Sequence, residues 1–104
     1  MNIPIYTLPR VPGADVVTPW TTFCQSRDPF IAIGYQTTRS TSRWQAVERK
    51  KKFEVTLYSH SITGFLHTSD SVWYPTLDAA RVGAARMAQN WAKIFSERAR
   101  KESA

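Results

Sequence analysis

Apolar residues recur at helical spacing along the last third of the chain and predict one long helix. The stripe extends over about five turns, beginning at Leu77 and ending at Phe95. Thr76 is a favourable N-cap residue, and Asp78 complements the positive end of the helix dipole. An apolar stripe of this length predicts a helix that lies across a sheet. The stripe consists of Leu77, Ala80, Ala84, Met87, Ala88, Trp91 and Phe95.

Alternation of apolar and polar residues predicts strands in the middle of the chain. The clearest alternation begins at Phe53, where every second residue is apolar. A strand beginning at Ile31 precedes it, and a long Ser/Thr/Arg-rich loop separates the two. We expect these strands to form an antiparallel meander. The expected strands are 31–35, 53–58, 62–68 and 72–74, with turns at 59–61 and Asp70-Ser71 and a stop at Pro75.

The first residues of the chain predict an arm followed by a short helix. Residues 1–17 contain three prolines and a glycine among isolated apolar residues, which favours an extended arm that lies on the domain or docks on a partner. Thr18-Pro19 is a typical helix start, and Asp28-Pro29 must end that helix. The expected organisation is an arm over 1–17, one domain over 18–96 and a charged tail over 97–104.

Composition agrees with one packed domain. The chain has 104 residues, of which 42% are hydrophobic, and it contains four tryptophans, so a core can form without a metal. The single cysteine, Cys24, excludes an intramolecular disulfide and a cysteine zinc cage. The N-terminus lacks the features of a signal peptide, and the sequence has no run of about 18 apolar residues. We therefore expect a soluble intracellular protein without a membrane partner, and the sequence does not distinguish cytoplasm from nucleus.

Positive charge is concentrated in one stretch of the chain. The formal net charge is +6, and residues 39–52 contain six Lys and Arg but only one acidic residue, Glu48. A clustered basic run favours a polyanionic partner, although such a run can also be a solvated loop or a nuclear-import signal. The basic group at the C-terminus is nearly balanced by Glu97 and Glu102, which is typical of a solvated helix end.

The sequence offers no convincing catalytic or metal-binding constellation. His60 and His67 lie seven residues apart in the strand-rich region, which is not a metal-ligand spacing on a helix. Cys24 belongs to the apolar face of the first predicted helix, where a free cysteine acts as a small hydrophobe. The four glycines are scattered, so a phosphate-binding loop is absent from the sequence. We expect a protein that is not an enzyme and needs neither a cofactor nor a metal.

The order of a helix, three strands and a longer helix, with a basic loop after the first strand, resembles the double-stranded RNA-binding domain family. Three motifs over roughly residues 18 to 95 carry the resemblance. Phe23-Cys24-Gln25-Ser26-Arg27 is similar to the end of the family's first helix, and Phe53-Glu54-Val55-Thr56-Leu57 is similar to its second strand. Ala80-Arg81-Val82-Gly83-Ala84-Ala85 is similar to the family's Ala-Lys-x-x-Ala-Ala in the second helix.

The resemblance implies an α+β fold of α-β-β-β-α order, with two helices on one face of a three-stranded antiparallel sheet. It also implies non-catalytic recognition of double-stranded or structured RNA by shape, accessory to RNA processing or silencing. In the family, the first helix and the first loop contact minor grooves, and the second helix contacts phosphates. The matching positions are Thr21, Thr22, Gln25, Arg39, Arg43, Arg49, Lys50, Lys51, Lys52 and Arg81.

Departures from the family pattern leave a second function open. Where the family has Lys-Lys-x-Ala-Lys, this chain has Leu77-Asp78-Ala79-Ala80-Arg81, so only one of the three charges remains. The alternative is a degenerate member that acts in protein–protein interaction or homodimerisation, and a small viral or phage inhibitor is a third interpretation. Aromatic residues are enriched at protein interfaces. The candidates for such an interface are Tyr6, Trp44, Trp73 and Tyr74.

Overall fold

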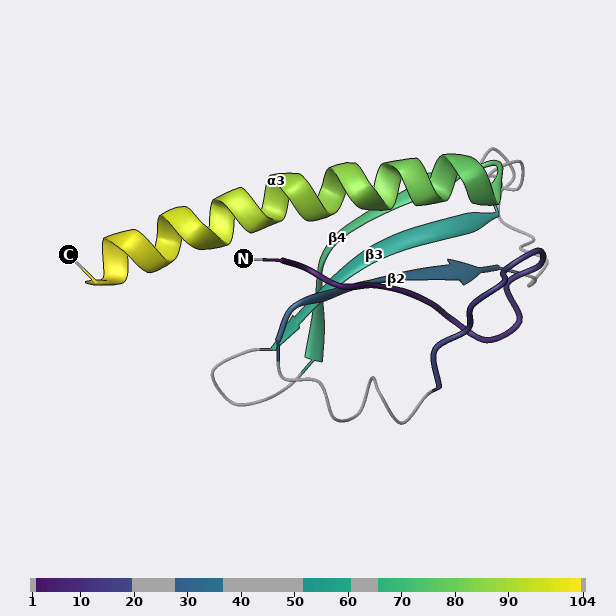
Figure 1. The fold of residues 1–104 in the computed structure, drawn as a ribbon, viewed down its shortest axis with the longest axis horizontal. Helices are drawn as coiled ribbons and strands as arrows, with labels where there is room; N and C mark the ends of the chain where they lie inside the picture. Colours follow the sequence, from purple (N-terminus) through teal and green to yellow (C-terminus); the bar gives the residue numbers. More distant parts are fainter. Residues whose placement is uncertain (1, 20–27, 37–51, 61–65, 104) are drawn as a thin grey trace, which may run out of the picture.

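The computed structural model describes residues 2–19, 28–36, 52–60 and 66–103. These residues form an α+β fold, in which one long helix lies across one face of a four-stranded sheet (Figure 1). The α+β class predicted from the sequence is therefore confirmed. The elements are β1 (Ile5–Thr7), β2 (Phe30–Tyr35), β3 (Phe53–His60), β4 (Leu66–Tyr74) and α3 (Leu77–Ser103).

The first predicted helix lies almost entirely outside the described residues. Thr18 and Pro19, its expected N-cap and first residue, are described and are not helical, whereas 20–27 are not described. Among the described elements, α3 covers one face of the sheet. The other helix that was predicted on this face falls on residues 20–27, which are not described.

The sheet has four strands, whereas the family resemblance implied three. β2, β3 and β4 form the expected antiparallel meander, but β1 adds to β2 in parallel and makes the sheet mixed. The N–H of Ile31 donates to the carbonyl of Pro4 at 2.9 Å, and the N–H of Leu8 donates to the carbonyl of Ile33 at 2.9 Å. Proline lacks the backbone N–H but keeps its carbonyl, so Pro4 can still accept a hydrogen bond at the end of a strand. The Pro-rich arm thus belongs to the domain.

One strand replaces the two short strands and the turn that were predicted at Asp70-Ser71. β4 continues through this dipeptide, and the register shifts, because Leu57 lies opposite Asp70 while the next residue, Tyr58, lies opposite Thr68. Ser69 is therefore left without a register partner in β3 and forms a bulge in β4. A bulge is a position at which turn-forming residues are tolerated within a strand. The Asp70 carboxylate also accepts two hydrogen bonds of 2.9 Å, from the Ser71 N–H and from Trp91 Nε1. The turn expected at 59–61 does not begin at Ser59, since β3 continues to His60.

The core lies between α3 and the sheet. Alternate residues of β2 and β3 point to this face, and the largest of them are fully buried. Small residues of α3 allow the helix to approach the sheet closely, as the alanine spacing predicted. Gly83 takes part in this approach, because a Cβ at that position would fall on the ring of Tyr74. The buried cluster contains Ile3, Ile31, Ile33, Val55, Leu57, Ala80, Ala84 and Met87.

α3 is longer than the apolar stripe. It has 27 residues, so it is about 40 Å long at 1.5 Å per residue. Its C-terminal half projects beyond the sheet (Figure 1). Residues 97–103, the predicted charged tail, therefore continue the helix, and their charges belong to a helix end. Arg100 and Lys101 lie in the last turn, where positive charge complements the helix dipole.

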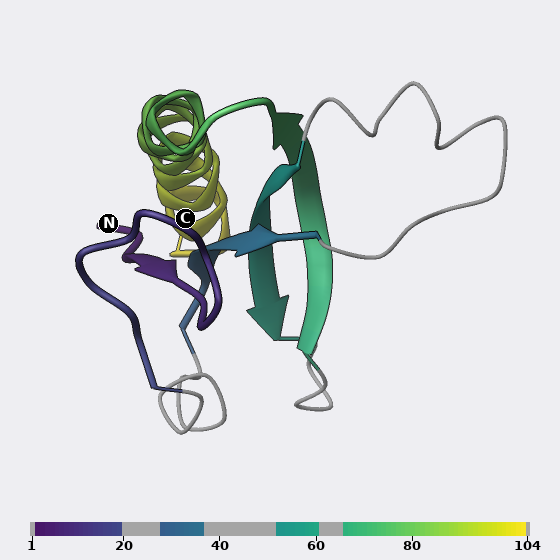
Figure 2. The same cartoon turned by 90° about the vertical axis from the view of Figure 1, so that its right-hand side faces the viewer.

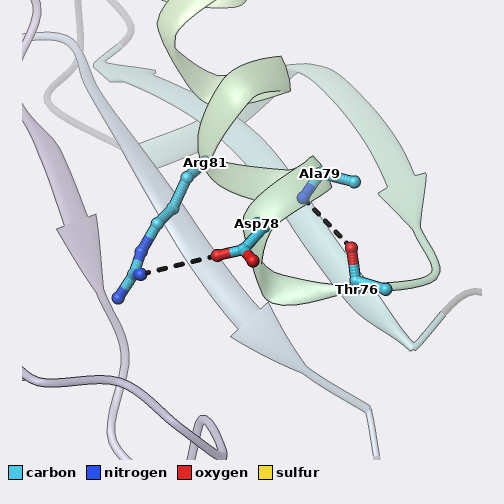
Figure 3. A network of polar contacts seen from close by, with 4 residues as sticks. All are labelled: Thr76, Asp78, Ala79 and Arg81. Carbon is cyan, nitrogen blue, oxygen red and sulfur yellow. Dashed lines mark hydrogen bonds and ion pairs between the residues drawn. The ribbon is translucent and has the colours of Figure 1, made fainter.

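The predicted cap of α3 is present, and its removal should destabilise the protein. The Ala79 N–H donates to Thr76 Oγ1 at 3.1 Å (Figure 3). Thr76→Ala leaves this N–H without a side-chain acceptor, so we expect the free energy of unfolding to fall by about 1 kcal/mol. Chemical denaturation monitored by circular dichroism measures the change. Thr76→Ser, which retains the hydroxyl, should stay close to wild type, and an equal loss in both variants would show that the cap is not the cause.

Candidate nucleic-acid interface

Three strands and the start of α3 meet at one end of the sheet, which we call the basic end. Tyr35 pairs with Phe53, and Phe53 pairs with Tyr74, three residues before α3 begins at Leu77. The rings of Tyr35 and Phe53 are 5.1 Å apart. Beyond this pair, the Gln36 N–H donates to the carbonyl of Lys52 at 2.9 Å. The chain therefore leaves the sheet at Gln36 and returns at Lys52, next to the start of α3.

Two of the predicted RNA-contacting residues are described, and both belong to the basic end. Lys52 is exposed and directly precedes β3. Arg81 lies in the second turn of α3 and is exposed. Its Nη1 is 3.9 Å from Oδ1 of Asp78 (Figure 3). An exposed pair at this distance contributes little free energy. The guanidinium of Arg81 can exchange this contact for a phosphate at small cost.

Most of the charge excess of the protein maps to sequence that is attached at the basic end. The described residues contain eight Lys and Arg and seven Asp and Glu, a net charge of +1. The remaining +5 of the total +6 comes from Arg27 and from the segment 37–51, whose two ends join Gln36 and Lys52. The basic run thus leaves the sheet at Gln36 and returns to it at Lys52, at the end of the sheet where β4 ends and α3 follows.

The other predicted RNA-contacting residues lie outside the described part of the chain. Lys52, directly before β3, and Arg81, in the second turn of α3, are therefore the two of these residues that the structure describes. The positions outside the description are Thr21, Thr22, Gln25, Arg39, Arg43, Arg49, Lys50 and Lys51.

The predicted protein-interface residues have different surroundings, and Trp44 lies outside the description. Tyr74 is half-buried against Gly83 of α3, so its ring contributes to the core. Tyr6 packs near Phe30, with 5.9 Å between the ring centroids. Trp73 lies opposite Glu54 in the β3–β4 register and is half-buried on the sheet face that points away from α3.

A small aromatic cluster covers part of the sheet face that points away from α3. Phe30 is fully buried there, and its ring stacks on Tyr58 at 5.3 Å. Burial raises the pKa of the Tyr58 phenol, the nearby Glu54 carboxylate raises it further, and the hydrogen bond with Thr56 opposes the shift. The phenol is therefore neutral at physiological pH, and the cluster presents no charge from this ring.

Polar residues beside the bulge form a small group of contacts in the described structure. Ser59 Oγ lies 3.2 Å from His67 Nε2 and 2.7 Å from Ser69 Oγ. A serine nucleophile needs a base that a third group orients, and the nearby Asp70 carboxylate instead accepts from Trp91. Within residues 2–19, 28–36, 52–60 and 66–103, no group of three His, Cys, Asp or Glu side chains is arranged to hold a metal.

Sequence reasoning missed the contacts that Asp70 makes with α3. Asp70 was interpreted as a turn residue and Trp91 as a core residue, but the two are joined by the indole hydrogen bond. The guanidinium of Arg98 lies 6.0 Å from the Trp91 ring and 5.8 Å from the Phe95 ring. A spacing of seven residues between Trp91 and Arg98 on one helix face was the available signal. The hydrogen bond from Trp91 to Asp70 joins α3 to β4, whereas the contacts of Arg98 lie within α3.

Comparison with known proteins identifies no relative. No protein-family model, curated protein or solved structure matches the chain. Among the described elements, α3 is the only helix, and it is not apolar enough to cross a membrane. The function therefore has to be inferred from the sheet, from α3 and from the position of the charge.

Proposed function

We propose that this protein is a non-catalytic domain that binds double-stranded or structured RNA through its basic end. The observation that carries the proposal is the hydrogen bond between Gln36 and Lys52, which joins the ends of the basic segment at the sheet end where α3 starts. The two described cations at this end, Lys52 and Arg81, come from different elements and extend the basic segment onto the folded domain.

The chemistry of this end suits phosphate more than base edges. Lysine and arginine neutralise backbone phosphates, and the deep major groove of A-form RNA hides the base edges from side chains. Recognition is then a matter of duplex shape and charge, with little dependence on sequence. Asp78 is fully exposed beside Arg81 and repels phosphate, so Arg81 is a weaker phosphate ligand than the lysines of the family that the sequence resembles.

A duplex titration tests the proposal. A labelled RNA duplex of about 20 base pairs, long enough for a domain that spans about 16, is titrated with the protein beside the matching DNA duplex. Both titrations are done at two salt concentrations, because phosphate contacts make the affinity salt-dependent. The proposal requires tighter binding to RNA than to DNA and weaker binding at the higher salt concentration. Equal binding to both duplexes, or no binding, would refute it.

A further inference from the structure

A loop of the N-terminal arm, residues 8–18, is fixed to the sheet next to the basic end, and we call it the arm loop. It begins at Leu8, whose N–H donates to the carbonyl of Ile33 at 2.9 Å. It ends at Thr18, whose N–H donates to the carbonyl of Thr7 at 2.9 Å. Figure 2 views the molecule from the basic end and shows the arm loop in purple, below the start of α3.

The arm loop also contacts the start of α3. A Cβ added at Gly13 would lie 3.8 Å from Cδ2 of Leu77, which is an ordinary van der Waals distance. Arg81 follows Leu77 by four residues, so the two are neighbours on one side of the helix. The side of α3 that carries Arg81 is therefore the side that the arm loop contacts.

Two successive turns shape the arm loop, and each has a proline followed by a residue with positive φ. In the second turn these residues are Pro12 and Gly13, and φ is 78° at the glycine. Proline followed by glycine is typical of a type II turn, whose second central residue requires positive φ. In the first turn they are Pro9 and Arg10, and φ is 71° at the arginine. Arginine thus occupies a position that glycine adopts with less strain.

The positive charge of Arg10 is held close to the end of β2. Its neighbour Val11 is buried, which fixes this part of the arm loop to the domain. Two residues of chain span at most about 7 Å, so the Cα of Arg10 lies within about 7 Å of the Cα of Leu8. A Cβ added at Gly34 would lie 3.3 Å from Cδ1 of Leu8, and Gly34 is two residues before Gln36, where the basic segment leaves the sheet.

The side chain of Arg10 is available to a ligand. It is exposed, and it takes part in no ion pair with another described residue. Asp15, the other charged residue of the arm loop, is also exposed and does not pair with it. Arg81, in contrast, has to leave Asp78 before it can bind another anion.

We propose that Arg10 binds a backbone phosphate of the RNA and extends the binding surface of the basic end onto the arm loop. This inference rests on the proposed function and adds a contact to the same site. Phosphate is the ligand that suits Arg10, because an exposed guanidinium presents several N–H donors and a permanent charge. Disfavoured backbone conformations persist where the surrounding structure holds them, and they cluster at binding sites. Here the two turns and the buried Val11 hold the arginine in place.

Replacement of Arg10 by glycine separates the side chain from the backbone conformation. Glycine adopts positive φ without strain, so Arg10→Gly should unfold at a temperature no lower than that of the wild type. The same variant should bind the labelled RNA duplex at least about threefold more weakly, with a salt slope smaller by about 0.9. Arg10→Lys keeps the charge and should therefore keep the wild-type salt slope.

Arg86→Ala is the matched control, because Arg86 is an exposed arginine in the third turn of α3 and its loss changes the net charge equally. This control should lose less affinity than Arg10→Gly. If Arg10→Gly does not fold, as judged by circular dichroism, Arg10→Asn replaces it, because asparagine also tolerates positive φ. RNA binding that the Arg10 variant leaves unchanged, or equal losses in that variant and in Arg86→Ala, would overturn this inference alone. A wild-type protein that does not bind RNA would overturn the proposed function as well.

Discussion

Reversal of two charges at the basic end, Lys52→Glu with Arg81→Glu, should weaken duplex RNA binding by at least about tenfold, or about 1.4 kcal/mol. Both side chains are exposed, so their replacement leaves the core unchanged. Each lost phosphate contact also lowers the salt dependence, by a slope of about 0.9 on the scale known for duplex DNA. The double variant should therefore bind more weakly and with a smaller salt slope. Fluorescence anisotropy titrations at several salt concentrations measure both quantities.

The matched control for this prediction changes the net charge equally at the other end of the molecule. Lys93→Glu with Lys101→Glu alters two exposed cations of α3 that lie in its second half. If binding depends on the basic end, this control should lose much less affinity than Lys52→Glu with Arg81→Glu. Equal losses in the two double variants would mean that RNA responds to net charge alone and that no particular surface is the binding site.

Gly83→Ala should destabilise the protein by about 2 kcal/mol, although alanine is the better helix former by about 1 kcal/mol. Gly83 is buried in α3, and an added Cβ would fall on the aromatic ring of Tyr74. The added Cβ meets the outer atoms of the half-buried Tyr74 ring, so the substitution forces this ring out of its place against α3. Chemical denaturation gives the change in the free energy of unfolding.

A double-mutant cycle separates this steric effect from helix propensity. Tyr74→Ala removes the ring, and in that background Gly83→Ala should become stabilising by up to about 1 kcal/mol. The sign of the glycine substitution therefore reverses when the ring is absent. A substitution that costs the same in both backgrounds would contradict the contact between Gly83 and Tyr74 and the close packing of α3 on β4.

The long-range periodicities were the parts of the fold that could be predicted. The helix from Leu77 and the strand from Phe53 follow from patterns that extend over several residues, and each buries one face. The strand Ile5–Thr7 could not be predicted in the same way. It has three residues and lies between Pro4 and Pro9, which is too short a segment to show the alternation of apolar and polar residues. Its pairing with β2 is decided by the tertiary fold.

The same distinction applies to the bulge in β4. Asp70 and Ser71 favour turns locally, but Asp70 accepts a hydrogen bond from Trp91, which is 21 residues further along the chain. A contact at that separation cannot be inferred from local preference, and here it keeps the dipeptide within a strand. The predicted turn was wrong for this reason.

Charge was the most informative signal for the site. Its location in the sequence was evident, and the topology adds that the basic segment is attached beside the start of α3, where Arg81 lies. For Tyr74, in contrast, the sequence did not show the surroundings of the side chain. It was an interface candidate because aromatic residues favour interfaces, but its ring packs on Gly83, a contact that the sequence cannot show without the helix position.

Mapping of the bound RNA onto the protein tests the central claim most directly. Uniformly ¹⁵N-labelled protein is titrated with a duplex of about 20 base pairs, and each backbone amide is followed by nuclear magnetic resonance. Our account predicts that the largest shift changes among the described residues occur at Gln36, Lys52 and Arg81, with little change in the second half of α3. Changes centred on Tyr6 and Tyr58, or on Trp91 and Arg98, would contradict it, because RNA would then bind to another surface.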